Sequence, residues 1–245
     1  MPVFSSIDVS EDIKHGIANG IFMAVTHDIP DLIRDYNLPT NNGIGLFRWN
    51  FLHKRVEENL GGRFQSKYVA RGPWRLLLLY EQELGFTFSV MAEKNLAGLR
   101  ERLPINIHYL ESLVSNNIGY EAIEGQLRLE GCNFPRNAQA IGALRDKLLS
   151  DFSGIIKNHI LILFDYNISG VISARAVLLT PELDVAFSED WSKHLKNPYV
   201  IGQDSILEEM VSDGEPLVKI KEGKLKEQTD TLVSIAEPHV TSSVG

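Results

Sequence analysis

Two short, almost unbroken apolar runs constrain the fold of this chain more than any other feature of its sequence. Residues 76–79 read LLLL within the segment 74–81, and residues 159–166 read HILILFDY. Both runs have the length of a strand, and a strand this apolar needs cover on both faces, as the central strands of a sheet have. We therefore expect both runs in the interior of one sheet, with helices on one or both of its faces.

A similar order of elements surrounds each run. The periodicity predicts helices at 46–60, 93–102, 105–116, 136–152 and 188–195, and strands at 64–71, 74–81, 86–92, 126–129, 159–166, 171–180 and 183–187. The sequence thus predicts an α+β fold. Its mostly antiparallel central sheet is built from two helix–three-strand–helix units, residues 43–102 and 133–195.

Further helices are expected before the first unit. Residues 9–27 predict a helix capped by Ser10, and Pro30 begins a second, short helix at 31–36. We expect residues 1–195 to form a single compact domain. Residues 196–245 are acidic and lack a sustained period, which predicts a partly ordered C-terminal appendage.

The composition favours a cytoplasmic protein with no cofactor, no metal and no membrane association. The chain has one cysteine, Cys132, so neither an intramolecular disulfide nor a thiolate cluster is expected. The N-terminal residues lack the basic segment of a signal peptide. The apolar residues 17–25 are fewer than the roughly 20 that span a bilayer.

Positive charge is concentrated in one part of an acidic chain. The net charge is −8, yet residues 46–75 carry seven basic and two acidic side chains, a net charge of +5. The basic residues of this island are Arg48, Lys54, Arg55, Arg63, Lys67, Arg71 and Arg75. In the strand 64–71, Lys67 and Arg71 share a face with Arg63 because the three are four residues apart. The alternative is a solvated sheet face whose charges pair with Glu57, Glu58 or the acidic tail.

The basic island favours a non-enzymatic interaction protein. We expect it to dock an acidic macromolecule, either nucleic acid or protein, with an affinity that falls as salt rises. Gly43 and Gly45 open the helix that carries Arg48, and free N–H groups at such a helix start favour an anion.

The aromatic residues near the island have two interpretations. Trp49, Trp74 and Trp191 each accompany an amphipathic element, which favours a place in the core. If Phe64 or Tyr68 instead faced outward beside the arginines, stacking on single-stranded bases would be expected.

The alternative function is that of a degenerate metal-dependent nuclease or another hydrolase. A helix followed by a strand meander that ends in Glu93 and Lys94 is similar to the restriction-endonuclease-like core, which implies metal-dependent nuclease activity. That core carries Glu-x-Lys on its third strand, whereas Glu93 directly precedes Lys94, and adjacent strand residues point to opposite faces. Glu81 or Glu83 would replace the first acid, and Asp165 ends an apolar strand either as a catalytic acid or as a turn cap.

Overall fold

The computed structural model describes residues 7–38, 40, 42–71, 74–101, 106–123 and 137–195, except for the side chain of Arg71. The chain divides into two units, Met1–Pro198 and Tyr199–Gly245, and all the described residues belong to the first. The predicted tail 196–245, the predicted strand 126–129 and Cys132 lie outside the described residues. In the described part of the chain, no helix combines the length and apolarity that a bilayer crossing requires.

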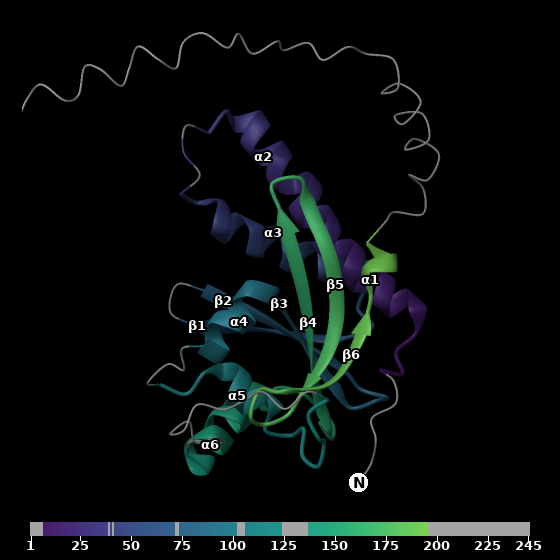
Figure 1. The fold of residues 1–245 in the computed structure, drawn as a ribbon. Helices are drawn as coiled ribbons and strands as arrows, with labels where there is room; N and C mark the ends of the chain where they lie inside the picture. The colour runs from purple at the N-terminus through teal and green to yellow at the C-terminus, as the bar shows by residue number, and fades with distance from the viewer. Residues whose placement is uncertain are drawn as a thin grey trace, which may run out of the picture. The chain divides into compact units, whose positions relative to one another are not determined.

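The described strands form one six-stranded sheet in which spatial order follows chain order (Figure 1). They are β1 (Gln65–Arg71), β2 (Trp74–Glu81), β3 (Phe86–Ala92), β4 (Asn158–Asn167), β5 (Gly170–Leu179) and β6 (Val185–Asp190). Neighbouring strands are antiparallel except for β3 and β4, which are parallel. The sheet therefore consists of two three-stranded meanders joined along β3 and β4. The predicted α+β fold with a mostly antiparallel central sheet is confirmed.

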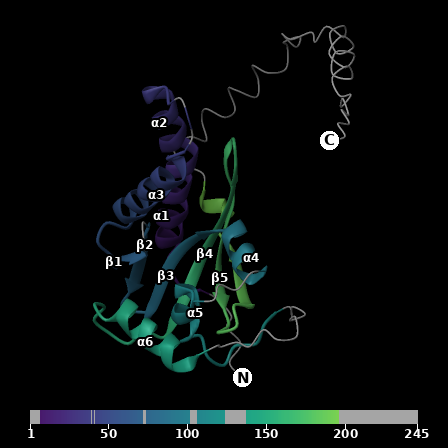
Figure 2. The same ribbon diagram turned by 90° about the vertical axis from the view of Figure 1, so that its left-hand side faces the viewer.

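Helices cover both faces of the sheet (Figure 2). Helices α1 (Glu11–Phe22) and α3 (Ile44–Leu60) pack on one face, against Leu77 and Leu79. Helices α4 (Glu93–Glu101), α5 (Tyr109–Val114) and α6 (Ala138–Leu149) pack on the other, against Leu76 and Leu78. Because side chains alternate along a strand, the leucine run of β2 supplies both cores, which is the two-sided burial that its composition predicts.

The N-terminal helices differ from the prediction. The structure has one unbroken helical segment that comprises α1, a π-helical segment η1 (Met23–Asp28) and α2 (Ile29–Tyr36). The backbone stays right-handed helical at Met23 and Asp28, the residues where a break would fall. The predicted interruption before Pro30 is therefore wrong. Proline has no N–H to donate to the preceding turn, and the wider π turn before it absorbs this loss. The Ser10 side chain makes no capping hydrogen bond.

Two glycines have distinct roles in the α1–α3 pair: Gly20 lets the helices approach closely, and Gly61 ends α3. A Cβ atom at Gly20 would lie 2.9 Å from the backbone of Val56, a separation that real Cβ atoms do not show. The glycine that weakens α1 as an isolated helix thus lets the two helices approach closely. Gly61 ends α3 in the left-handed conformation, with a φ of 57°, and its N–H donates to the carbonyl of Glu57. Gly61 therefore forms the C-terminal cap of this helix.

The helix predicted at 188–195 is wrong. Strand β6 continues to Asp190, with Glu189 opposite Ala176 of β5 and Asp190 opposite Arg175. Within the described residues, which end at Leu195, the short 3-10 turn η2 (Ser192–His194) follows it. Ladder pairing with β5 overrides the helix-start signal of the Ser-Glu-Asp sequence, since pairing depends on a strand that lies elsewhere in the chain. The Asp190 carboxylate accepts a hydrogen bond from the N–H of Ser192 at 2.8 Å, so it caps this turn.

Candidate functional site

The first meander is open at one end. Strands β2 and β3 pair over only three residues, from Leu79 opposite Phe88 to Glu81 opposite Phe86, all beside their connecting hairpin. Beyond these pairs the strands separate. Meanwhile β2 remains paired with β1 as far as Trp74, and β3 remains paired with β4 as far as Ala92. The sheet therefore has an opening between the two strands that bound it.

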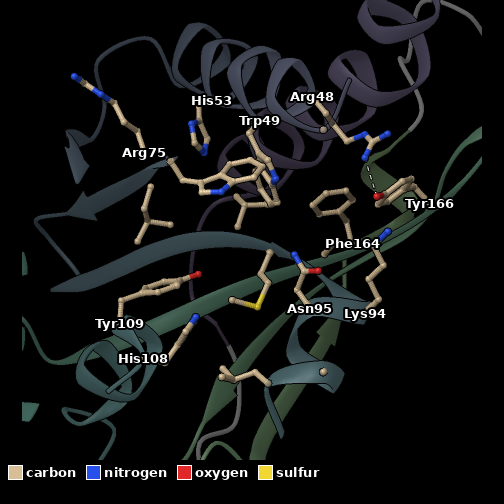
Figure 3. Close-up of a pocket in the computed structure, with 18 residues that line it drawn as sticks. Arg48, Trp49, His53, Arg75, Lys94, Asn95, His108, Tyr109, Phe164 and Tyr166 are labelled. Atoms are coloured by element: carbon tan, nitrogen blue, oxygen red, sulfur yellow. Dashed lines mark hydrogen bonds between the residues drawn. The ribbon is translucent and has the colours of Figure 1, made fainter. Parts of the chain in front are cut away.

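A cavity of about 780 Å³ occupies this opening (Figure 3). Its lining combines residues of β2 and β3 with Trp49 of α3, Asn95 of α4 and Tyr109 of α5. These helices belong to the two different layers that cover the sheet. A cavity can be lined by both layers only where the sheet between them is interrupted.

A second cavity of about 610 Å³ adjoins the first along α3. The two share four lining residues: Trp49, His53, Trp74 and Arg75. The second cavity also borders Lys54 and Tyr68, together with the carboxylates of Glu57 and Glu58. We call the two cavities together the groove.

The charge of the first cavity is positive. Its described lining includes Arg48, Arg75 and Lys94 and contains no aspartate or glutamate. Within the part of the chain that the structure describes, none of these three cations forms an ion pair with a carboxylate. Three uncompensated cations around one hollow attract anions, even though the whole chain is acidic.

Tyr166 of β4 holds two of the cations at one wall. An η nitrogen of Arg48 donates to the Tyr166 hydroxyl at 2.8 Å, and the guanidinium carbon lies 4.3 Å from the ring centroid (Figure 3). The ammonium of Lys94 lies 4.8 Å from the same centroid. Cation–π contact orients a cation without neutralising it, so both retain their charge for a ligand. The ε nitrogen of Arg48 is buried and lacks a hydrogen-bond partner among the described residues.

The aromatic side chains of the groove correct one prediction. Trp191 is fully buried, as expected, but Trp49 is only half-buried and Trp74 is 41% exposed. The Trp49 ring is fixed edge-on against Phe164, with ring centroids 6.0 Å apart, and it also lies beside His53. Trp74 is outside the core because it begins β2 at the open end of the sheet, where neither helical layer covers it.

Two titratable groups of the groove have shifted pKa values. Burial lowers the pKa of His53 to about 4, so its ring is neutral at pH 7. Burial, with a hydrogen bond to the Glu57 carboxylate, raises the pKa of Tyr68. Both side chains therefore contribute uncharged ring surface to the groove at neutral pH.

The described side chains of the predicted basic residues lie in several separate neighbourhoods. Arg48 and Arg75 line the first cavity, and Lys54 lines the second, 3.8 Å from Glu58. Arg55 makes two hydrogen bonds to Asp28, at 2.8 and 2.6 Å.

Two further basic residues, Arg63 and Lys67, point away from the groove, and the side chain of Arg71 lies outside the described residues. Arg63 precedes β1 and lies 3.9 Å from Asp12. Lys67 lies on the opposite sheet face, 2.8 Å from Asp151 and near the backbone of α6. The pleat alternation that separates Lys67 from Tyr68 causes this division, because Tyr68 faces α3.

The four candidate catalytic residues are not brought together. Glu81 accepts the N–H of Leu84 at 2.6 Å within the β2–β3 hairpin. Glu93 is ion-paired with Arg175 of β5. Lys94 faces the cavity, and the exposed Asp165 carboxylate accepts its neighbour's N–H at 2.8 Å.

Glu81 and Glu93 are also too far apart to act on one site. They lie beside opposite ends of β3, and seven residues of strand span roughly 20 Å. Among the described residues, no three His, Cys, Asp or Glu side chains are grouped closely enough to hold a metal ion.

Asn95 and Tyr166 are groove residues that the sequence did not indicate. Asn95 follows Lys94 in the first turn of α4, and Tyr166 follows Asp165 where the β4–β5 register shifts. Neither has a local pattern that indicates a site. For the exposed Trp74, the sequence does contain a signal: it follows the pair Gly72-Pro73, which is typical of a turn, and a residue just after a turn lies at the end of a sheet.

The sheet order, the two helical layers and the groove define an α+β protein with an open, cation-lined cavity at one end of its sheet. The chain belongs to the Family of unknown function (DUF5986), which it matches over residues 6–235. It matches none of the curated proteins and none of the solved structures.

Proposed function

We propose that this protein is a non-enzymatic, cytoplasmic interaction protein that binds single-stranded nucleic acid in the groove. The observation that carries the proposal is the lining of the first cavity, where Arg48, Arg75 and Lys94 lie among aromatic rings and have no carboxylate partner among the described residues. The cytoplasmic location is supported by the single cysteine, which is typical of a reducing compartment.

Nucleic acid fits this lining better than an acidic protein does. Cationic side chains neutralise backbone phosphates, and aromatic faces stack on unpaired bases with about 1–3 kcal/mol for each base. The groove offers Trp49 together with the partly exposed Trp74 and Tyr68. An acidic peptide would use the cations and leave these rings without a partner. Stacked bases in a duplex would not reach them, which favours a single strand.

The hydrolase alternative has less support. Glu81, Glu93 and Asp165 each take part in a local contact in a different part of the fold. A metal-dependent nuclease needs its carboxylates on one metal site, so these residues favour a role in structure.

Fluorescence anisotropy with labelled twelve-nucleotide DNA and RNA strands tests the proposal. The test variant is Arg75→Glu with Lys94→Glu, since both side chains are exposed and their replacement leaves the core intact. We expect its affinity to fall at least tenfold with an unchanged melting temperature. We also expect wild-type affinity to fall steeply from 50 to 200 mM salt.

A matched control keeps the change in charge equal. Arg63→Glu with Lys193→Glu also replaces one arginine and one lysine, both exposed and outside the groove, where they pair with Asp12 and Glu11. We expect this control to bind as wild type. Equal weakening in both double variants, or full binding by the groove variant, would overturn the proposed site.

A further inference from the structure

The size of the first cavity is that of a small-molecule site. Its volume of about 780 Å³ falls inside the range of roughly 300–1,000 Å³ that such sites occupy. A single nucleotide is a ligand of this size, whereas a helical duplex is not. The cavity therefore suits one nucleotide, either free or belonging to a strand.

The two strands that border the opening offer directional hydrogen-bonding groups. Beyond Leu79 and Phe88, β2 and β3 have no ladder pairs with each other, while Leu76, Val90 and Met91 line the cavity. An unpaired strand edge presents N–H and C=O groups in a fixed order. Such groups suit the edge of a nucleobase, which also carries donors and acceptors in a fixed order.

Asn95 adds a carboxamide at the same place. It lies in the first turn of α4 and points into the cavity (Figure 3). Its side chain has no hydrogen-bond partner within the described part of the chain. An amide both donates and accepts, so Asn95 can distinguish bases by the groups on their edges.

A flat wall and an anion site complete the cavity. The indole of Trp49 is held in place by Phe164, and His53 beside it is neutral at pH 7 because burial lowers its pKa. Phe164 also stacks on Tyr166, with ring centroids 5.6 Å apart, and Arg48 and Lys94 both contact Tyr166. Lys94 also lies in the first turn of α4, where the helix dipole adds positive potential.

From this arrangement, which rests on the proposed function, we infer that the β2–β3 opening binds one nucleotide, with its base against Trp49 and Asn95 and its phosphate against Arg48 and Lys94. The ligand class is a nucleoside monophosphate. It is either a free nucleotide or a nucleotide unit of a single strand, and the recognising chemistry is the same in both.

A titration tests this inference. The ligands are the four ribonucleoside 5′-monophosphates, ribose 5-phosphate and adenosine, and binding is measured by tryptophan fluorescence and calorimetry. We expect at least one nucleotide to quench the fluorescence and to bind at least tenfold more tightly than either ribose 5-phosphate or adenosine. That result would show that the base and the phosphate both contribute to the affinity. Equal affinity for ribose 5-phosphate and all four nucleotides would overturn the inference.

Two substitutions of exposed residues separate the two halves of the site. Lys94→Met is expected to lower the affinity for nucleotides and for ribose 5-phosphate at least fivefold and to leave the affinity for adenosine unchanged. Asn95→Ala is expected to change the order of preference among the four bases and to leave ribose 5-phosphate unaffected. Lys193→Met, outside the groove, is the control for the loss of one lysine, and thermal melting confirms that each variant is folded. If Asn95→Ala leaves the base preference unchanged, the assignment of the base site is wrong.

Comparison with longer ligands distinguishes the two sources. Twelve-nucleotide strands with a 5′-phosphate, strands without one and circular strands are titrated in parallel with the mononucleotides. Strands that bind and compete with mononucleotides support the inference and identify the ligand as a nucleotide unit of a strand. Binding by mononucleotides alone supports the nucleotide site with a free nucleotide as its ligand, and overturns the proposed binding of single strands. Strands that bind in the groove without competition from any mononucleotide overturn the single-nucleotide site and leave the proposed function standing. Absence of binding by every ligand overturns both.

Discussion

The two meanders of the sheet have the same order of strands, but only the first is open. In the second meander β4 and β5 pair over eight residue pairs, whereas in the first β2 and β3 pair over three. Residues 160–164 of β4 are at most 1% exposed, while β2 begins with two exposed residues, Trp74 and Arg75. Strands that are apolar throughout stay between the helical layers, and a strand that begins with bulky polar residues leaves them.

The difference between the meanders also explains how the groove is built. The open meander supplies the space and Arg75, and the closed meander supplies the rigid wall through Phe164 and Tyr166. At Asp165 and Tyr166 the β4–β5 register shifts, and a bulge of this kind redirects a side chain. A ligand site of this kind needs an open region that provides the cavity and a rigid region that fixes the positions of its side chains.

The largest expected effect comes from truncating one leucine in each meander. Leu163 of β4 is fully buried, and its replacement by alanine leaves a dry void that costs about 3–4 kcal/mol of unfolding free energy. Leu76 of β2 already borders the cavity, so Leu76→Ala is expected to cost about 1–2 kcal/mol. Urea denaturation measures both. Equal losses would show that the first meander is as tightly packed as the second.

The next effect is a loss of stability in acid. Burial lowers the pKa of His53 to about 4 and that of His159, in the closed meander, to about 3. Both values lie below the unfolded value of 6.5, so the folded protein binds fewer protons and stability falls as the pH drops below 6.5. At pH 5 each histidine is expected to lower the unfolding free energy by about 2 kcal/mol relative to pH 7.

Urea unfolding at pH 7 and pH 5 measures this loss. His53→Gln removes the groove histidine and is expected to reduce the pH-dependent loss by about 2 kcal/mol. The loss from His159 remains, because Thr87 and Ser89 hold that ring within the sheet at 3.0 Å each. An undiminished loss in His53→Gln would mean that His53 is solvated and the groove more open than described.

A smaller effect is expected from removing one tyrosine hydroxyl in each meander. Tyr166→Phe removes the hydroxyl that accepts a hydrogen bond from the partly buried guanidinium of Arg48, which is expected to lower the unfolding free energy by about 1 kcal/mol. Tyr68→Phe removes a hydrogen bond to the exposed Glu57, where water replaces it, and costs less than about 0.5 kcal/mol. Thermal melting of both variants compares them. The reverse order would contradict the rigid wall assigned to the second meander.

The smallest effect concerns the basic residue on the far face of the first meander. Lys67→Met breaks an ion pair with the largely exposed Asp151, and such pairs add little to stability. The melting temperature and the affinity for single strands are both expected to match wild type. The Lys67 ammonium lowers the pKa of Asp151, so NMR titration should show this pKa rising in the variant. Loss of nucleic-acid binding would return Lys67 to the candidate interface.

Much of the local structure follows from the sequence. The predicted bounds of β2 and β3 match the structure. These elements are predictable because alternation, turn residues and apolar runs act over a few neighbouring positions. The predicted helix at 188–195 and the break before Pro30 are wrong, since in both places contacts with distant segments or an altered helical turn outweigh the local signal.

The candidate site was predictable only in part. The basic island contains Arg48 and Arg75, and Lys94 had been considered as a catalytic residue. Nothing in the sequence places these three around one cavity, because they come from α3, β2 and α4. The separation of β2 from β3 decides that arrangement, and strand separation depends on how the two helical layers pack.

The sequence by itself determined that this chain forms an α+β protein with a sheet buried on both faces, since two short apolar runs have no other way to leave water. It also determined that positive charge gathers within residues 46–75. The tertiary structure alone decided which of those charges meet. Strand alternation directs Lys67 to one face and α3 holds Arg48 on the other, and Tyr166, more than 100 residues further along the chain, brings Lys94 beside Arg48.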